Sequence, residues 1–77
     1  MGMGASRSQN ASVVLDVGKV YRVTHQYLGT FTARAIEPGG GWCGFCILEA
    51  NDALSREGFN VGEYVELTAN SYKARAL

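Results

Sequence analysis

The chain has 77 residues, 47% of them hydrophobic and 18% charged, and its seven basic and seven acidic side chains give a net charge of zero. A chain of this length forms one small domain, which excludes a doubly wound α/β sheet and an α/β barrel. Neutrality excludes a surface that is electropositive throughout, but it allows a local basic patch.

The first predicted segments are a tail and a strand. Met1–Ser12 is rich in Gly, Ser, Asn and Gln, so we predict a disordered N-terminal tail, with residues 13–77 forming a single small β-barrel domain. From Val13 onward the hydrophobic residues recur with a period of two, which is typical of a half-buried strand reaching Val23. Gly18 interrupts this run and indicates a bulge or a bend. The expected inward side chains are those of Val13, Leu15, Val17, Tyr21 and Val23.

The middle of the chain predicts two more strands with a loop between them. After a turn at Gln26–Gly29, apolar and polar residues alternate through Phe31–Ala35, which indicates a second strand. One Pro and three Gly within Glu37–Gly41 cannot continue a strand ladder, so this segment predicts a loop. Trp42–Ala50 is a dense apolar run, which we interpret as a central strand buried on both faces.

The last third contains one candidate helix and two strands. Within Asn51–Gly62 about one helical turn is expected, with Asn51 or Asp52 as its N-cap and Gly58 at its end. Glu63–Ala69 alternates with a period of two and predicts a strand whose inward residues are Val65 and Leu67. Tyr72–Leu77 then forms a short last strand with Lys73 and Arg75 pointing outward.

Five short strands in a chain of this size predict an all-β fold. A small five-stranded antiparallel barrel buries one face of the sheet and leaves few exposed edges. Two barrel types fit, the OB-like type and the Src-homology-3/Tudor/Sm-like type. The short helical turn after the third strand favours the OB-like order.

Two segments resemble a known family of domains. Val17–Thr24, followed by Gly29-Thr30-Phe31-Thr32, resembles the opening of RNA-binding OB-fold domains of the ribosomal-protein repeat type, which begins Gly-x-Val-x-x-Val and continues to Gly-x-Phe. Val61–Leu67 is similar to the fourth strand of that family, where a Val-Gly pair precedes an alternating run. The resemblance implies an OB fold and RNA binding. The third strand departs from the family's pattern at Trp42–Cys46.

The segment Trp42-Cys43-Gly44-Phe45-Cys46 supports a second interpretation, because it is similar to the Trp-Cys-Gly-Pro-Cys motif of thioredoxins. That redox chemistry requires both sulfurs at the start of a helix, where the helix dipole lowers a thiol pKa. If Cys46–Glu57 is helical, Cys43 and Cys46 form a redox pair. If the segment is a strand, they point to opposite faces about 10 Å apart and act as small hydrophobes. With His25 they are also three possible zinc ligands, one fewer than a structural site uses.

A binding face is the main functional hypothesis. Basic residues alternate with threonines at outward positions of the first, second and last strands, and exposed aromatic residues supply contact area for a ligand. The candidate binding residues are Arg22, Tyr27, Arg34, Trp42, Lys73 and Arg75.

The expected function is therefore that of a binding module without a cofactor. No arrangement of residues typical of hydrolytic catalysis is recognisable, so we expect no enzyme activity. The partner is a nucleic acid (RNA or single-stranded DNA) or a protein. A neutral, apolar chain also favours a homo-oligomer or a subunit of a complex. Apolar stretches far shorter than the roughly 20 residues of a membrane helix predict no membrane span, and two cysteines, too few for a disulfide scaffold, favour a cytoplasmic location.

Overall fold

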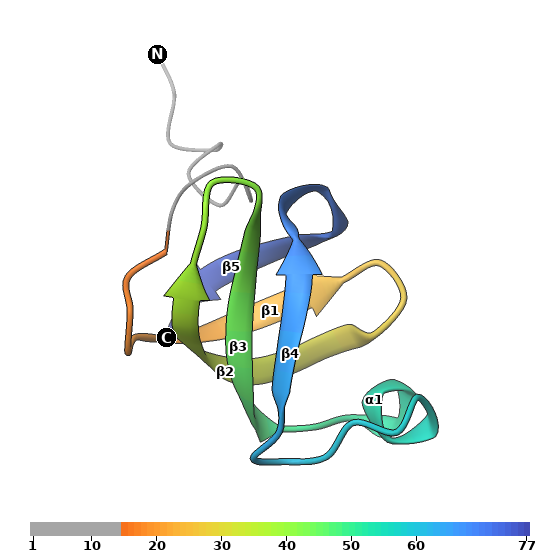
Figure 1. The fold of residues 1–77 in the computed structure, drawn as a ribbon. Helices are drawn as coiled ribbons and strands as arrows, with labels where there is room; N and C mark the ends of the chain where they lie inside the picture. Colours follow the sequence, from red (N-terminus) through yellow and green to blue (C-terminus); the bar gives the residue numbers. More distant parts are fainter. Residues whose placement is uncertain (1–14) are drawn as a thin grey trace.

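The computed structural model describes residues 15–77, so the predicted tail Met1–Ser12 and Val13 lie outside the described part of the chain. The strands are β1 (Val20–His25), β2 (Gly29–Pro38), β3 (Trp42–Glu49), β4 (Tyr64–Thr68) and β5 (Tyr72–Ala76). A short helix, α1 (Asp52–Arg56), follows β3, and a 3₁₀ turn, η2 (Ala69–Ser71), joins β4 to β5. The expected five strands and the helical turn after the third strand are both confirmed (Figure 1).

All strand pairs in the sheet are antiparallel, and the strand order is β4-β3-β2-β1-β5. Each of the first three strands is therefore paired with the next one along the chain, and the fifth returns to pair with the first. β4 and β5 lie at the two ends of this order, so in the described part of the chain the sheet, which is curled (Figure 1), is not closed into the predicted barrel by a β4–β5 pair.

β2 is the middle strand of the sheet and connects two halves, one containing β1 and β5 and the other containing β3 and β4. Its pairing with β3 shifts register between Thr32 and Ala33 and again between Ala35 and Glu37, while its pairing with β1 is regular. Such bulges bend a strand and increase its twist. As a result β1 and β5 cross β3 and β4 at a steep angle, and β2 contributes to both halves (Figure 1).

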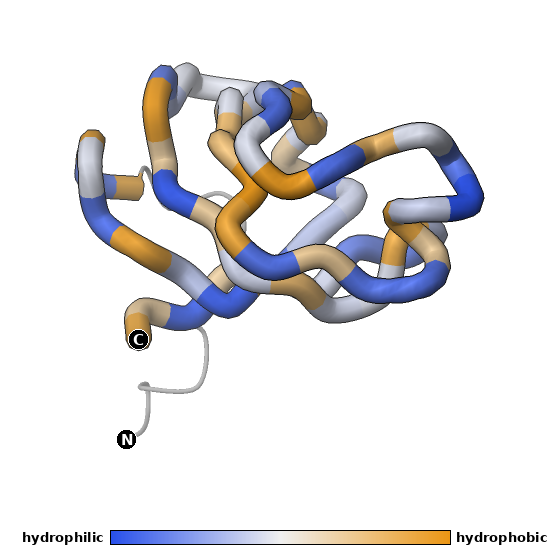
Figure 2. Tube along the Cα trace, turned by 90° about the horizontal axis from the view of Figure 1, so that it is seen from below, coloured by the Kyte–Doolittle hydropathy of each residue, from blue (hydrophilic) through white to orange (hydrophobic). Residues whose placement is uncertain are grey.

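The core lies between these two halves. Hydrophobic and hydrophilic residues alternate along the strands (Figure 2), and the apolar set faces inward. The predicted inward residues Val23, Val65 and Leu67 are buried, as are the three apolar positions of Phe31–Ala35. The largest fully buried side chains are those of Phe45, Ile47, Leu54, Val23 and Cys43.

The first strand starts later than the sequence predicts. Asp16–Lys19 forms a tight turn, closed by the Lys19 N–H donating to the Asp16 carbonyl at 3.2 Å, and β1 begins at Val20. Gly18 adopts a φ of +85°, a left-handed conformation that glycine alone adopts without cost. Because the chain reverses there, the predicted inward residue Val17 is 71% exposed. Leu15, before the turn, does pack against the core.

The predictions for the loop after β2 and for β3 need correction as well. Glu37 and Pro38 belong to β2, opposite Gly44 and Cys43, so the loop consists of residues 39–41. Pro38 is the last residue of its strand, a position where its missing N–H is tolerated. β3 is a strand, but it is not buried on both faces. Its side chains alternate between the core and the surface, and Trp42 is 39% exposed.

The helix α1 is defined by signals at both ends. The Asn51 side chain accepts a hydrogen bond from the Leu54 N–H at 2.8 Å, so Asn51 is the N-cap. Gly58, with a φ of +90°, and Phe59 donate to the Ser55 and Leu54 carbonyls, which is the Schellman arrangement. The helix buries Leu54 against the sheet. In residues 15–77, no helix has the length and apolar character needed to cross a membrane.

Candidate binding face on strands β1 and β5

The predicted cations of the first and last strands lie side by side. Arg22 on β1 is the direct partner of Arg75 on β5, and Thr24 is the partner of Lys73. Residues directly opposite each other in an antiparallel pair point to the same side of the sheet. All four are exposed, whereas their neighbours Val23 and Ala74 are buried, so the four side chains share the outer face of the sheet.

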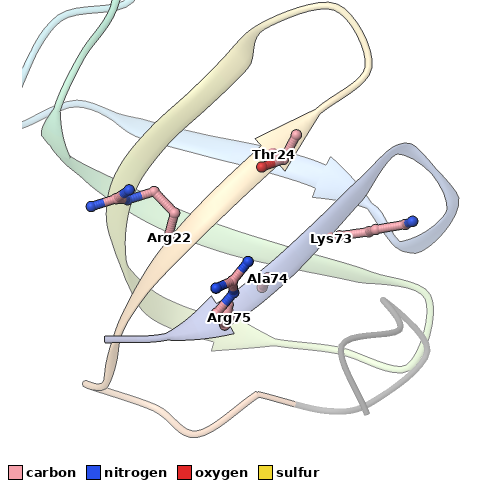
Figure 3. A pocket seen from close by; sticks show the side chains of 5 residues that line it. All are labelled: Arg22, Thr24, Lys73, Ala74 and Arg75. Atoms are coloured by element: carbon pink, nitrogen blue, oxygen red, sulfur yellow. The ribbon is translucent and has the colours of Figure 1, made fainter. Parts of the chain in front are cut away.

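A hollow of about 500 Å³ lies over this pair of strands. It is lined by Arg22 and Thr24 from β1 and by Lys73, Ala74 and Arg75 from β5 (Figure 3). We call it the cationic hollow. Three basic residues therefore line one surface depression of a chain whose net charge is zero, with the Arg22 and Lys73 side chains extending to opposite sides of it (Figure 3).

The other predicted binding residues are not part of this hollow. Arg34 on β2 is opposite Val20, and its guanidinium donates to the Gly18 carbonyl at 3.0 Å, so it stabilises the turn before β1. Tyr27 is 78% exposed at the β1–β2 turn, with its ring 5.9 Å from that of His25. Trp42 lies at the start of β3, opposite Thr68 on β4.

Trp42 packs over the glycine loop. A Cβ at Gly39 would lie 2.8 Å from the Trp42 indole, so only glycine allows this close approach. The Gly39 N–H donates to the Trp42 carbonyl at 2.7 Å, which closes the β2–β3 loop. Trp42 therefore has a structural role in this loop.

Cys43 and Cys46 are free and do not form a pair. Both lie on β3 rather than at a helix start, three residues apart, so Cys43 points into the core and Cys46 is half-buried on the other face. Burial raises the pKa of the Cys43 thiol to about 11, and a hydrogen bond with Tyr72 only partly offsets this effect. The arrangement lacks the helix-terminal thiolate on which the redox hypothesis depends.

His25 has a structural role at the end of β1. Its Nδ1 atom accepts hydrogen bonds from the backbone N–H groups of Tyr27 at 3.0 Å and Leu28 at 3.1 Å. An imidazole nitrogen that accepts is unprotonated, and desolvation lowers the His25 pKa from its ordinary 6.5. Among residues 15–77, His, Cys, Asp and Glu side chains form no group of three or more able to hold a metal ion.

The sequence interpretation missed a carboxylate–tyrosine cluster on the outer face of β2, β3 and β4. The Tyr64 hydroxyl lies 2.8 Å from a Glu37 carboxylate oxygen and 2.9 Å from one of Glu66. The hydroxyl shares its one proton between the two carboxylates, and its bond to Glu37, desolvation and then its bond to Glu66 raise the Tyr64 pKa well above its usual range. Gly44 lies between Glu37 and Glu66 in the sheet, and a Cβ there would overlap the Tyr64 ring. The signal was the glycine inside an apolar strand, which marks a close approach.

Known proteins do not supply an identity for this arrangement. A scan against protein-family models, a search of curated proteins and a search of solved structures all gave no match. The site must therefore be interpreted from its own geometry.

Proposed function

We propose that the chain is a non-enzymatic binding module that contacts the phosphates of RNA or single-stranded DNA through the cationic hollow. The observation that carries the proposal is the direct pairing of Arg22 with Arg75. Like charges directly opposite on neighbouring strands destabilise a sheet. A pair that lowers stability and has no structural benefit of its own is typical of a functional site.

The chemistry of the hollow matches a phosphodiester chain. Guanidinium groups bind phosphate oxygens with two parallel hydrogen bonds, and lysine adds a point charge. The Thr24 hydroxyl, which also shares a hydrogen bond of 3.1 Å with the Thr30 hydroxyl, is a further polar group of the hollow. This grouping satisfies the electrostatic requirement for a nucleic-acid site without a basic chain overall.

The fold is compatible with a binding role, but it does not identify the ligand. Of the two expected barrel types, the strand order β4-β3-β2-β1-β5 favours the Src-homology-3-like type, in which the last strand returns beside the first. The strand order departs from the OB-like order expected from the sequence, so the resemblance to RNA-binding OB domains adds no argument for the ligand. Because one fold has many functions, the proposal depends on the hollow.

The test is fluorescence anisotropy with labelled mixed-sequence RNA and DNA oligonucleotides, each about 12 nucleotides long. With three phosphate contacts, the affinity should fall roughly twenty-fold between 50 and 200 mM salt. Arg22→Gln should weaken binding and reduce this salt dependence. The matched control is Arg56→Gln, the same charge change at an exposed position on α1. If the chain binds neither oligonucleotide at 50 mM salt, or if both variants weaken binding equally, the proposal is wrong.

A further inference from the structure

A second hollow adjoins the cationic hollow at the end of β1 and the start of β5. It measures about 310 Å³ and shares Thr24 and Lys73 with its neighbour. Its lining also includes Gln26 from the β1–β2 turn and Asn70 and Ser71 from η2. We call it the amide hollow, because two carboxamide side chains stand at its edge.

The chemistry of the amide hollow differs from that of the cationic hollow. Gln26 and Asn70 are both exposed and uncharged. A carboxamide carries two N–H donors and one carbonyl acceptor, so it is able to pair with the mixed donors and acceptors at the edge of a nucleobase. The backbone N–H of Gln26 donates to the backbone carbonyl of Ser71 at 3.0 Å, and this bond connects the β1–β2 turn to η2, the two segments that carry these side chains.

The opposite side of the cationic hollow is unfavourable for a nucleic acid. A third hollow there, of about 280 Å³, shares Arg22 but is also lined by Glu49. The Thr32 hydroxyl donates to the Glu49 carboxylate at 3.1 Å, which keeps that negative charge beside Arg22. A phosphodiester chain leaving the cationic hollow is repelled on this side, so it continues past Lys73 toward Gln26 and Asn70.

We infer that the amide hollow binds a nucleobase whose own phosphate lies in the cationic hollow, and that Gln26 and Asn70 select among the bases. The inference rests on the proposed function and adds base selectivity to it. Two aromatic rings line the amide hollow, the Tyr72 ring, which is 5% exposed, and the half-buried His25 imidazole. Stacking on a ring tolerates every base, so selectivity comes from hydrogen bonds to the base edge.

The experiment measures binding of the full chain to three labelled oligonucleotides of about eight nucleotides, made only of dA, dC or dT. For the wild type we expect a difference of roughly five-fold between the best and the worst base, the lower end of what one amide–base pair contributes. The double variant Gln26→Ala/Asn70→Ala should bind all three with similar affinity and an unchanged salt dependence. Arg22→Gln should weaken all three equally.

The matched control is Asn60→Ala, which removes an exposed carboxamide from the α1–β4 connection, away from both hollows. Amide NMR spectra check that each variant is folded, and the single variants replace the double one if it is not. Equal affinity of the wild type for the three bases overturns the inference but leaves the proposed function intact. A base preference that survives in the alanine variants also overturns it. Absence of all binding refutes the proposed function, and the inference with it.

Discussion

Arg22 and Arg75 are direct cross-strand partners on β1 and β5, with both side chains on the outer face of the sheet. Like charges on direct cross-strand partners repel each other, so this pair lowers the stability of the free chain. The register of the β1–β5 pairing places Arg22 opposite Arg75, and the same register places the residues that line the cationic hollow next to one another.

Arg75→Glu should stabilise the chain while it abolishes nucleic-acid binding. The substitution replaces a repulsive cross-strand pair by an attractive one, which is worth about 0.5–1 kcal/mol in the free energy of unfolding. Urea unfolding measures this value. The double variant Arg22→Glu/Arg75→Glu restores a like-charge pair, so its stability should return toward that of the wild type. Additive effects of the two substitutions would contradict the coupling.

Asn51→Asp should destabilise the chain although it keeps the helix cap. The Asn51 Nδ2 atom donates to the Leu28 carbonyl at 2.9 Å and to the Thr30 carbonyl at 2.7 Å, which fastens α1 to the β1–β2 turn. An aspartate still accepts from the Leu54 N–H but leaves both carbonyls unpaired, so we expect a loss of about 1–3 kcal/mol. Asp52→Asn, at an exposed position one residue later, is the control in the same unfolding experiment. An equal effect of the two changes would refute the role of the Nδ2 bonds.

His25 should make the chain less stable as the pH falls below about 6.5. Its folded-state pKa is lowered by desolvation, so the unfolded chain binds the proton more readily. Stability is therefore complete above the unfolded pKa and decreases as the pH falls through it. Protonation of Nδ1 also removes the acceptor used by Tyr27 and Leu28. Urea unfolding at pH 7.5 and pH 5 should show the decrease for the wild type, and His25→Asn should reduce it. The same pH dependence in both proteins would exclude His25 as its source.

One thiol per molecule should react in the native state. Cys46 is half-buried, whereas Cys43 is 2% exposed with a pKa of about 11, so at pH 8 only about one Cys43 thiol in a thousand is ionised. Ellman's reagent should therefore label Cys46 quickly and Cys43 only after unfolding. Cys46→Ser should eliminate the fast reaction, and Cys43→Ala should leave it unchanged. Formation of an intramolecular disulfide by the folded chain under mild oxidation would contradict this geometry.

Several elements could be predicted because their signals are local. Apolar and polar residues alternate through Phe31–Ala35 and Glu63–Ala69, and both segments form strands with the expected inward residues. The cap at Asn51 and the glycine at position 58 likewise delimit α1 as expected. A period of two and the residue preferences at helix ends arise from the geometry of a few neighbouring residues, so the sequence carries them directly.

The predicted burial of Val17 was wrong because the chain turns at a point where the sequence pattern continues. Val17 continues the alternation of the first strand, yet the left-handed Gly18 reverses the chain there and exposes it. An alternating sequence pattern predicts which residues face inward in a continuous strand, but it does not predict where the chain turns. Trp42 and Arg34 stay predicted binding residues, and the structure adds a local contact for each, Trp42 with Gly39 and Arg34 with the Gly18 carbonyl.

The sequence by itself determined the five strands, the inward face of most of them and the outward position of Arg22, Arg34, Lys73 and Arg75. Only the tertiary structure decided which cations lie together. Arg22 and Arg75 are far apart along the chain, and they meet because β5 returns to pair with β1 in one register. The register between distant strands depends on how the whole core packs and on how the sheet bends at β2. A shift of one residue in this register would turn every side chain of β5 to the other face of the sheet. The candidate binding face is therefore a property of the fold rather than of any segment.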